Sequence, residues 1–307
     1  MTGRSRLGRD RPPRVAFSTR RLAFEVDGDR CVGTLYRPDR PVTAPAVVWG
    51  SSVPLARRRG LAPVGEALAA RGYAVYCFDP RGVGESDGDP REALRRGHTD
   101  DWAAALARVR DCDSVDAGRP VLAGHGFAAG HAVAAAADDR RIGGVVAVAP
   151  VLDGRTFLRT RSRRATVRAV ADGVVDRVGS VVGRGRTVPA AGIDADRAFV
   201  AAPGAAAAVR SLLPAGETLP EVPARSFLSA ARFRPGERVD DIRCPTCFVA
   251  GSDDPVAPAD DVADAAARAR DGTFVRLPVG HFDLLRGRTR RALLDHVVAF
   301  LDREFDR

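Results

Sequence analysis

Short apolar runs alternate with helical stretches along most of the chain, and this alternation constrains the fold more strongly than any other feature of the sequence. Each run has the length and composition of a strand that is buried on both faces of a sheet. The clearest runs lie at 46–49, 73–78, 120–123 and 144–149, with helical patterns at 61–71, 103–109 and 131–137. Such alternation predicts an α/β fold with a mostly parallel, doubly wound sheet.

The alternation stops after the run at 144–149 and resumes only with the apolar run at 246–250. The stretch between them contains helical patterns at 164–178 and 196–213, several Pro and Gly residues, and no strand pattern. We therefore expect a helical cap that is inserted into the sheet domain. The expected division is a basic N-terminal arm at 1–20, a core at 21–151 and 239–307, and a cap at 152–238.

The formal net charge of +9 also bears on function, because a basic chain can bind nucleic acid. All 48 basic residues are arginine, however, which favours a GC-rich genome over a selected phosphate-binding surface. No apolar run approaches the length of a membrane span, and the five cysteines form no short-spaced framework. We expect a cytoplasmic protein whose partner is a small-molecule substrate, and neither nucleic acid nor a membrane; the sequence leaves a homodimer open.

Ligands of open α/β sheets bind at the carboxyl ends of the strands, so the loops that follow the strands are the places to look for chemistry. Four such loops lie at 79–86, 124–130, 251–256 and 278–283. The last two carry Asp254 and His281, and a histidine with a carboxylate behind it can take up a proton near neutral pH.

In their order and on their elements, these loops resemble those of the α/β-hydrolase family. Asp254 in Gly251-x-x-Asp matches the acid of the family, and His281 in Gly280-His-Phe-Asp matches its histidine. The motif Asp-x-Arg-Gly-x-Gly-x-Ser at 79–86 matches its loop after the fourth strand. The resemblance runs from about 22 to 305 and is closest to a bacterial dienelactone-hydrolase-like and peptidase-like branch with a helical cap. It implies the α/β-hydrolase fold.

The chain departs from this family at the nucleophile. The family motif is Gly-x-Ser-x-Gly, a strained strand-to-helix elbow that lifts a serine hydroxyl above the sheet. Here the segment from Gly124 reads Gly-His-Gly-Phe-Ala, so Gly126 stands at the nucleophile position and no acyl-enzyme can form there. The expected oxyanion hole keeps two backbone donors, which are the amide of Phe127 and the amide of Ser52 or Val53.

These residues would provide a base, an acid that orients the base, and an oxyanion site, but no nucleophile. Such a set predicts proton abstraction next to a carbonyl. We expect an enzyme in which His281 and Asp254 provide general-base catalysis on an apolar substrate with a carbonyl or phenol group. The expected chemistry is C–C bond formation, cyclisation, elimination or lyase chemistry in secondary metabolism, with no cofactor and no metal. Two alternatives stay open: a slow ester or thioester hydrolase that uses a His281-activated water, and a non-catalytic ligand-binding protein.

Further residues are candidates for contacts with the substrate. They are Ser51 and Trp49 next to the expected oxyanion loop, and Phe157 and Arg159 in the cap. The arginine cluster at 159–168 is interpreted either as a solvated face or as a contact with an oxygen-rich substrate. Asp153 lies at the end of another strand and is the alternative candidate for the acid, in place of Asp254.

Overall fold

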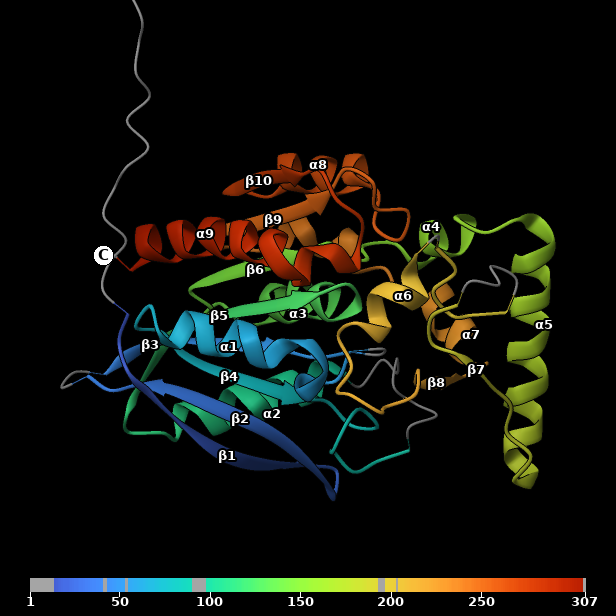
Figure 1. Cartoon of the computed structure of the whole chain (residues 1–307), viewed down its shortest axis with the longest axis horizontal. Coiled ribbons are helices and arrows are strands. Elements are labelled where there is room, and N and C mark those ends of the chain that lie inside the picture. Colours follow the sequence, from blue (N-terminus) through green and yellow to red (C-terminus); the bar gives the residue numbers. More distant parts are fainter. Residues whose placement is uncertain are drawn as a thin grey trace, which may run out of the picture.

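An eight-stranded sheet forms the centre of the molecule, with the strand order β1-β2-β4-β3-β5-β6-β9-β10 (Figure 1). The computed structural model describes residues 14–40, 43–52, 55–89, 98–192, 197–202 and 204–305. The strands of the sheet are β1 (Phe17–Val26), β2 (Asp29–Pro38), β3 (Ala44–Gly50), β4 (Ala74–Asp79), β5 (Val115–His125), β6 (Gly144–Val148), β9 (Thr246–Gly251) and β10 (Gly272–Leu277). In this sheet the pairings of β2 with β1 and with β4 are antiparallel, and the other five pairings are parallel. The expected mostly parallel α/β sheet is thereby confirmed.

The hairpin of β1 and β2 closes one edge of the sheet. β1 begins at Phe17, which pairs with Pro38. Residues 17–20 therefore belong to the sheet, and the basic arm expected at 1–20 is wrong for these four positions. Their polar side chains are compatible with a strand because an edge strand exposes them to water. Residues 1–13 lie outside the described part of the chain.

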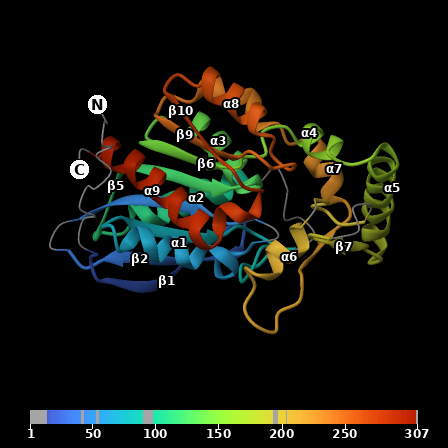
Figure 2. The same ribbon diagram turned by 45° about the horizontal axis from the view of Figure 1, so that its top comes forward.

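Helices cover both faces of the sheet, which explains why β3, β4, β6 and β9 are buried along their whole length. The helices of this domain are α1 (Ala62–Ala69), α2 (His98–Arg110), α3 (Phe127–Asp138), α8 (Ala259–Arg268) and α9 (Gly287–Glu304). α1 and α9 lie over one face, and α2, α3 and α8 lie over the other (Figures 1 and 2). Among the described residues, no helix is both long and apolar enough to cross a membrane.

The chain between β6 and β9 lies at the end of the sheet where the parallel strands finish (Figure 1). Its described elements are α4 (Gly154–Arg159), α5 (Arg163–Gly179), β7 (Thr187–Pro189), α6 (Ala205–Arg210), β8 (Glu221–Pro223) and α7 (Ser226–Ala231). The limits of the cap at 152 and 238 stay a prediction.

Two expectations for this stretch are wrong. β7 and β8 pair antiparallel although no strand was expected, because Val188 and Val222 are buried opposite each other in two three-residue strands that are too short to show a sequence period. The helix expected at 196–213 is reduced to α6, which begins after Gly204 in a left-handed conformation. Part of that expected range, at 196 and 203, lies outside the described residues.

Candidate active site

His281 and Asp254 form a buried hydrogen-bonded pair in the loops that follow β10 and β9, two neighbouring strands. Nδ1 of His281 donates to Oδ2 of Asp254 over 2.7 Å. The other carboxylate oxygen, Oδ1, accepts from the backbone amides of Val256 and Ala257 at 2.7 and 2.9 Å. Because the carboxylate holds the proton of a neutral imidazole on Nδ1, the lone pair on Nε2 is free to accept another.

Gly126 lies beside His281, at the turn between β5 and α3. Its backbone has φ +63° and ψ −124°, which is strained for any residue with a side chain. Three backbone hydrogen bonds hold this conformation: its amide donates to the carbonyl of Val148 at 3.0 Å, and its carbonyl accepts from the amides of Val151 and Gly130 at 3.1 and 3.2 Å. A Cβ atom on Gly126 would lie 3.2 Å from Nε2 of His281. The base therefore faces the point from which a nucleophile would project.

The amides of Phe127 and Ser52 are the expected donors next to this point. Phe127 is the first residue of α3, and its amide makes no backbone hydrogen bond to another described residue, whereas Ser52 forms a short antiparallel bridge with Leu55. The amide of Ser51 donates to the carbonyl of Phe78 at 2.9 Å and is not available. Val53, the other expected donor, lies outside the described residues. The amide of Phe127 can stabilise a developing oxyanion, with the N-terminus of α3 adding its positive dipole, and the second donor stays a prediction.

These groups line a small cavity of about 20 Å³. That volume holds about one water molecule. His281, Gly126, Phe127 and Ser52 line its reactive side. Its apolar wall consists of Leu55, Leu61, Val200, Val256 and Leu285.

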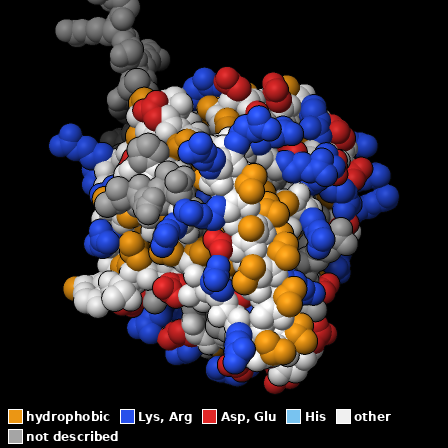
Figure 3. Space-filling model, turned by 90° about the vertical axis from the view of Figure 1, so that its right-hand side faces the viewer, with side chains coloured by type: hydrophobic (Ala, Val, Ile, Leu, Met, Phe, Trp, Pro, Cys, Tyr) orange, Lys and Arg blue, Asp and Glu red, His pale blue; other side chains and the backbone are white. Residues whose placement is uncertain are grey.

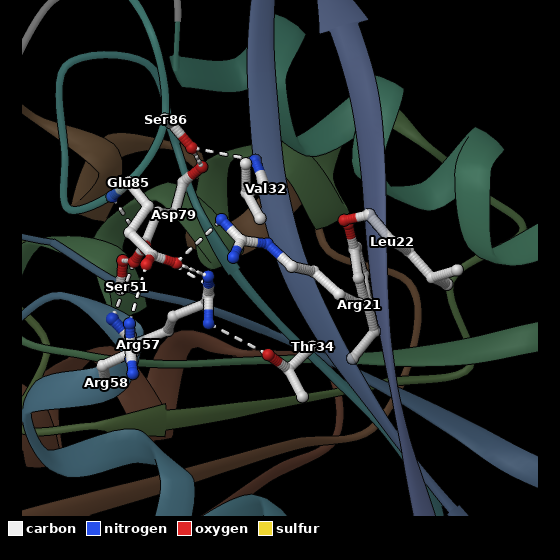
Figure 4. A network of polar contacts seen from close by, with 11 residues as sticks. Arg21, Leu22, Val32, Thr34, Ser51, Arg57, Arg58, Asp79, Glu85 and Ser86 are labelled. Carbon is white, nitrogen blue, oxygen red and sulfur yellow. Dashed lines mark hydrogen bonds and ion pairs between the residues drawn. The ribbon is translucent and has the colours of Figure 1, made fainter.

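A buried carboxylate anchors the loop that carries Ser52 (Figure 4). Oδ1 of Asp79 accepts from the hydroxyl of Ser51 at 2.6 Å and from the amide of Arg57 at 2.6 Å. Nε of Arg57 lies 3.3 Å from Oδ2 of Asp79. Burial raises the pKa of Asp79, and these donors oppose the rise because they stabilise the charged form. Ser51, which was expected to contact the substrate, lines the cavity, and its hydroxyl is bound to Asp79.

Two further residues of the motif at 79–86, Gly84 and Ser86, also lie against Asp79. Gly84 has φ +62°, and a Cβ atom there would lie 2.4 Å from Oδ2 of Asp79. The hydroxyl of Ser86 donates to the carbonyl of Asp79 at 2.6 Å and accepts from the amide of Val32 at 2.9 Å. The sequence analysis identified this motif but did not predict that its aspartate anchors the loop of Ser52. The motif itself, in which two glycines and a serine follow an aspartate closely, is the signal that could have indicated this function.

His125 lies against His281, with the ring centroids 4.4 Å apart. Its Nε2 donates to the carbonyl of His281 at 3.0 Å. Burial, and to a lesser extent the neighbouring His281, lowers the pKa of His125 to about 3. His125 therefore stays neutral at neutral pH and positions the loop of the base.

An aromatic cluster packs against the elbow from the side of α4. The ring of Phe127 contacts the rings of Phe157 and Phe199, at centroid distances of 5.1 and 5.7 Å. Arg161 is buried, donates to the carbonyl of Phe199 and lies 5.7 Å from the ring of Phe157. Sequence reasoning chose Arg159, which is exposed. The spacing of four residues between Phe157 and Arg161 is the signal that could have identified the buried arginine.

The other candidates lie away from the cavity. Trp49 is completely buried in β3 and does not line it. Asp153 begins α4, where it accepts from the amide of Arg155 at 2.7 Å and lies 3.9 Å from Arg234. Asp254, and not Asp153, is the acid in contact with His281. Within the described residues, no group of three or more His, Cys, Asp or Glu could hold a metal ion.

Replacing Asp79 with alanine should lower the free energy of unfolding by about 3 kcal/mol or more, because the buried Arg57 then keeps only the partly exposed Glu85 as a counter-charge and the Ser51 hydroxyl loses its acceptor. The matched control is Glu85→Gln at the partly exposed end of the same network, where Arg57 and Arg58 bind Glu85. We expect that change to cost about 1 kcal/mol or less. Urea unfolding measures both values, and an equal cost for the two variants would contradict this function of Asp79.

His125 should make the protein less stable as the pH falls. Its pKa of about 3 in the folded chain lies below the unfolded value, so the stabilisation is complete above about pH 6.5 and is lost from there down to pH 3. The slope should reach about 1.4 kcal/mol per pH unit. Replacing His125 with asparagine should remove this slope, whereas His296→Asn, at an exposed position of α9, should keep it. Unfolding curves from pH 4 to 7 test the difference, and parallel curves for His125→Asn and the native chain would disprove it.

Comparisons with known proteins point to one family. The family model described as alpha/beta hydrolase fold matches residues 56–287. The Quorum-quenching protein AidA of Acinetobacter baumannii is 31% identical over 285 residues, which cover 92% of this chain and 94% of AidA. Polyketide transferase grgF of a Penicillium species is 28% identical over 110 residues, 36% of this chain and 37% of that protein.

Solved structures agree with the family model in fold. The complex of DcsB with its substrate analogue has a TM-score of 0.81 at 21% identity and covers 94% of this chain and 100% of DcsB. The crystal structure of GrgF from Penicillium has a TM-score of 0.79 at 21% identity and covers 94% of this chain and 99% of GrgF. With a family model that spans most of the chain and a relative of 31% identity along nearly all of it, the chain belongs to the α/β-hydrolase fold family.

Proposed function

We propose that the chain is an enzyme in which Nε2 of His281 acts as a general base on a carbonyl-containing apolar substrate, without a covalent intermediate. One observation carries this proposal: Nε2 faces the elbow at Gly126, where a Cβ atom would lie only 3.2 Å away and no hydroxyl is present. A base in this position has no serine to activate. The proton that it takes must come from the substrate or from water.

Abstraction of a proton from the carbon next to a carbonyl suits this arrangement best. The C–H proton moves to Nε2 of His281, and the electron pair moves onto the carbonyl oxygen, where the amides of Phe127 and Ser52 stabilise the enolate. Asp254 balances the positive charge that His281 gains. The enolate carbon can then attack an electrophile or expel a leaving group, which gives C–C bond formation, cyclisation or elimination. The name polyketide transferase, which two relatives bear, supports a place in secondary metabolism.

The walls of the cavity favour an apolar substrate. Leu55, Val200 and Leu285 face the same space as the base. The cavity of about 20 Å³ is far smaller than the roughly 300–1,000 Å³ that small-molecule sites provide. Binding of a bulky substrate therefore requires these wall residues to move apart.

A second candidate is hydrolysis by a water molecule that His281 activates, and the size of the cavity favours it. A volume for about one water molecule lies between the base and the two amides. Water could attack an ester or thioester carbonyl there, with the same amides stabilising the oxyanion. An oxyanion site and substrate binding alone can supply roughly 10³–10⁴-fold acceleration, so this reaction would be slow and without a burst.

The first test distinguishes the two reactions by the origin of the proton. Saturated acyl thioesters and aryl alkyl ketones, whose α-hydrogens exchange slowly, are incubated with the chain in D₂O. Mass spectrometry should detect deuterium at the α-carbon, and His281→Ala should abolish the exchange because the base is lost. The exposed His296→Ala on α9 serves as the control and should keep it. Thiol release without α-deuteration would support the hydrolase instead, and binding that survives His281→Ala without any product would indicate a non-catalytic binding protein.

The second test restores the nucleophile. Gly126→Ser should gain labelling by a fluorophosphonate and a burst of aryl-ester cleavage, because the elbow, the base and the oxyanion donors surround the new hydroxyl. Both Gly126→Ser and the control Gly126→Ala should lose about 1–3 kcal/mol of stability through the strained backbone at positive φ. Only the serine variant should be labelled. A serine variant as inert as the alanine variant would show that this site is not assembled for carbonyl chemistry.

A further inference from the structure

Four arginines line one pocket at the end of the sheet where the parallel strands begin. The pocket has a volume of about 280 Å³. Its walls come from the first half of β5, from the end of α3 with the turn that follows it, and from the segment just before β9. The cap and the loop of His281 lie at the opposite end of the sheet, so this pocket is separate from the candidate active site (Figure 1). The four arginines are Arg119, Arg140, Arg141 and Arg243.

The acid of this pocket is already neutralised. Among the described residues that line the pocket, Asp139 is the only acidic one. Its two carboxylate oxygens accept from Nε and Nη2 of Arg141, both at 3.1 Å. Oδ2 also accepts from Arg110 at 3.1 Å. Asp139 is therefore shared between two arginines and does not balance the charge of the other three that line the pocket.

Those three arginines have no counter-charge. In the ranges that the structure describes, the side chains of Arg119, Arg140 and Arg243 make no hydrogen bond and no ion pair. All three are exposed to water, which screens their repulsion in part. Three positive groups around one hollow still produce a positive potential there, and a bound anion would be attracted to it.

The backbone that presents these side chains is fixed by close contacts. A Cβ atom on Gly143 would lie 2.4 Å from the carbonyl oxygen of Arg119, so a glycine is needed for the turn to pack against β5. The amide of Gly143 donates to the carbonyl of Pro120 at 2.8 Å, and the amide of Arg141 donates to Oδ1 of Asp139 at 2.9 Å. The fold therefore brings the arginines together before any ligand binds.

We propose that this pocket binds a small molecule that carries a phosphate group. Guanidinium groups bind phosphate through two parallel hydrogen bonds, and each has five N–H donors. A phosphate monoester offers three acceptor oxygens and a charge near −2, whereas a carboxylate offers two oxygens and a charge of −1. Phosphate is thus the group that matches three arginines without partners.

The floor of the pocket provides room for an apolar part of the same ligand. Ala136, Ile142 and Cys244 line the pocket and are buried. Burial raises the pKa of the Cys244 thiol to about 11, so this side chain stays uncharged at neutral pH. The volume of about 280 Å³ is close to the lower limit of roughly 300 Å³ for small-molecule sites. A phosphate ester with one small apolar group is therefore of suitable size.

The arrangement is less suitable for nucleic acid. A nucleic-acid backbone presents its phosphates in a row and is bound by a basic stripe along the surface. Here the arginines come from three segments and surround a single hollow. The side of the molecule that carries α5 differs again, because its basic side chains lie among acidic and hydrophobic ones (Figure 3).

Titration calorimetry of the full chain with phenyl phosphate tests the proposal. We expect one site per chain and a dissociation constant below about 1 mM at low salt. Arg243→Gln should weaken binding about tenfold, because it removes charged hydrogen-bond donors. Arg164→Gln removes the same charge from an exposed position of α5 and should have no effect. Absence of binding, or equal weakening by the two variants, would overturn the proposal.

Three further ligands test the chemical class. Benzoate has the same ring with a carboxylate and should bind at least about tenfold more weakly than phenyl phosphate. Inorganic phosphate lacks the ring and should also bind more weakly, and tighter binding than that of phenyl phosphate would contradict the proposed apolar contact. Binding of a short DNA duplex without binding of phenyl phosphate would overturn the small-molecule site.

A last variant separates this pocket from the proposed reaction. His281→Ala should bind phenyl phosphate as tightly as the native chain does, because the base lies at the other end of the sheet. Loss of binding in this variant would place the ligand in the candidate active site and overturn the proposal.

Discussion

The strained turn at Gly126 is the constraint on which the candidate site depends. A residue keeps such a conformation only where its surroundings determine it, and here hydrogen bonds from β6, from the loop after β6 and from α3 do so. These bonds involve only backbone atoms, so the turn does not need a serine. The elbow keeps the first amide of α3 next to the base whichever side chain stands at its tip.

Buried polar groups fix the other two parts of the site. Asp79 ties the loop of Ser52 to the segment at Arg57, and His125 ties the loop of His281 to the end of β5. Burying these groups costs free energy, which their hydrogen bonds offset. The proposed base and oxyanion donors are thereby held in fixed positions before any substrate arrives, which is the condition for electrostatic stabilisation of an enolate.

The sequence predicted most of the sheet because strands buried on both faces leave continuous apolar runs. It also predicted that Asp254 and His281 lie at strand ends, since both follow such runs directly. It could not reveal that the hydroxyl of Ser51 turns to Asp79, because that contact joins loops that are distant along the chain. The sequence also did not reveal that Arg161 is buried and Arg159 exposed, because the end of α4 decides which arginine is buried, and helix ends are poorly marked in a segment rich in arginine.

The central claim is that carbonyl chemistry proceeds here without an acyl-enzyme. Intact-protein mass spectrometry during consumption of an acyl thioester tests it most directly. We expect the mass of the chain to stay unmodified at every time point while the thioester is consumed. A transient increase by the mass of the acyl group would reveal a covalent intermediate and contradict the account.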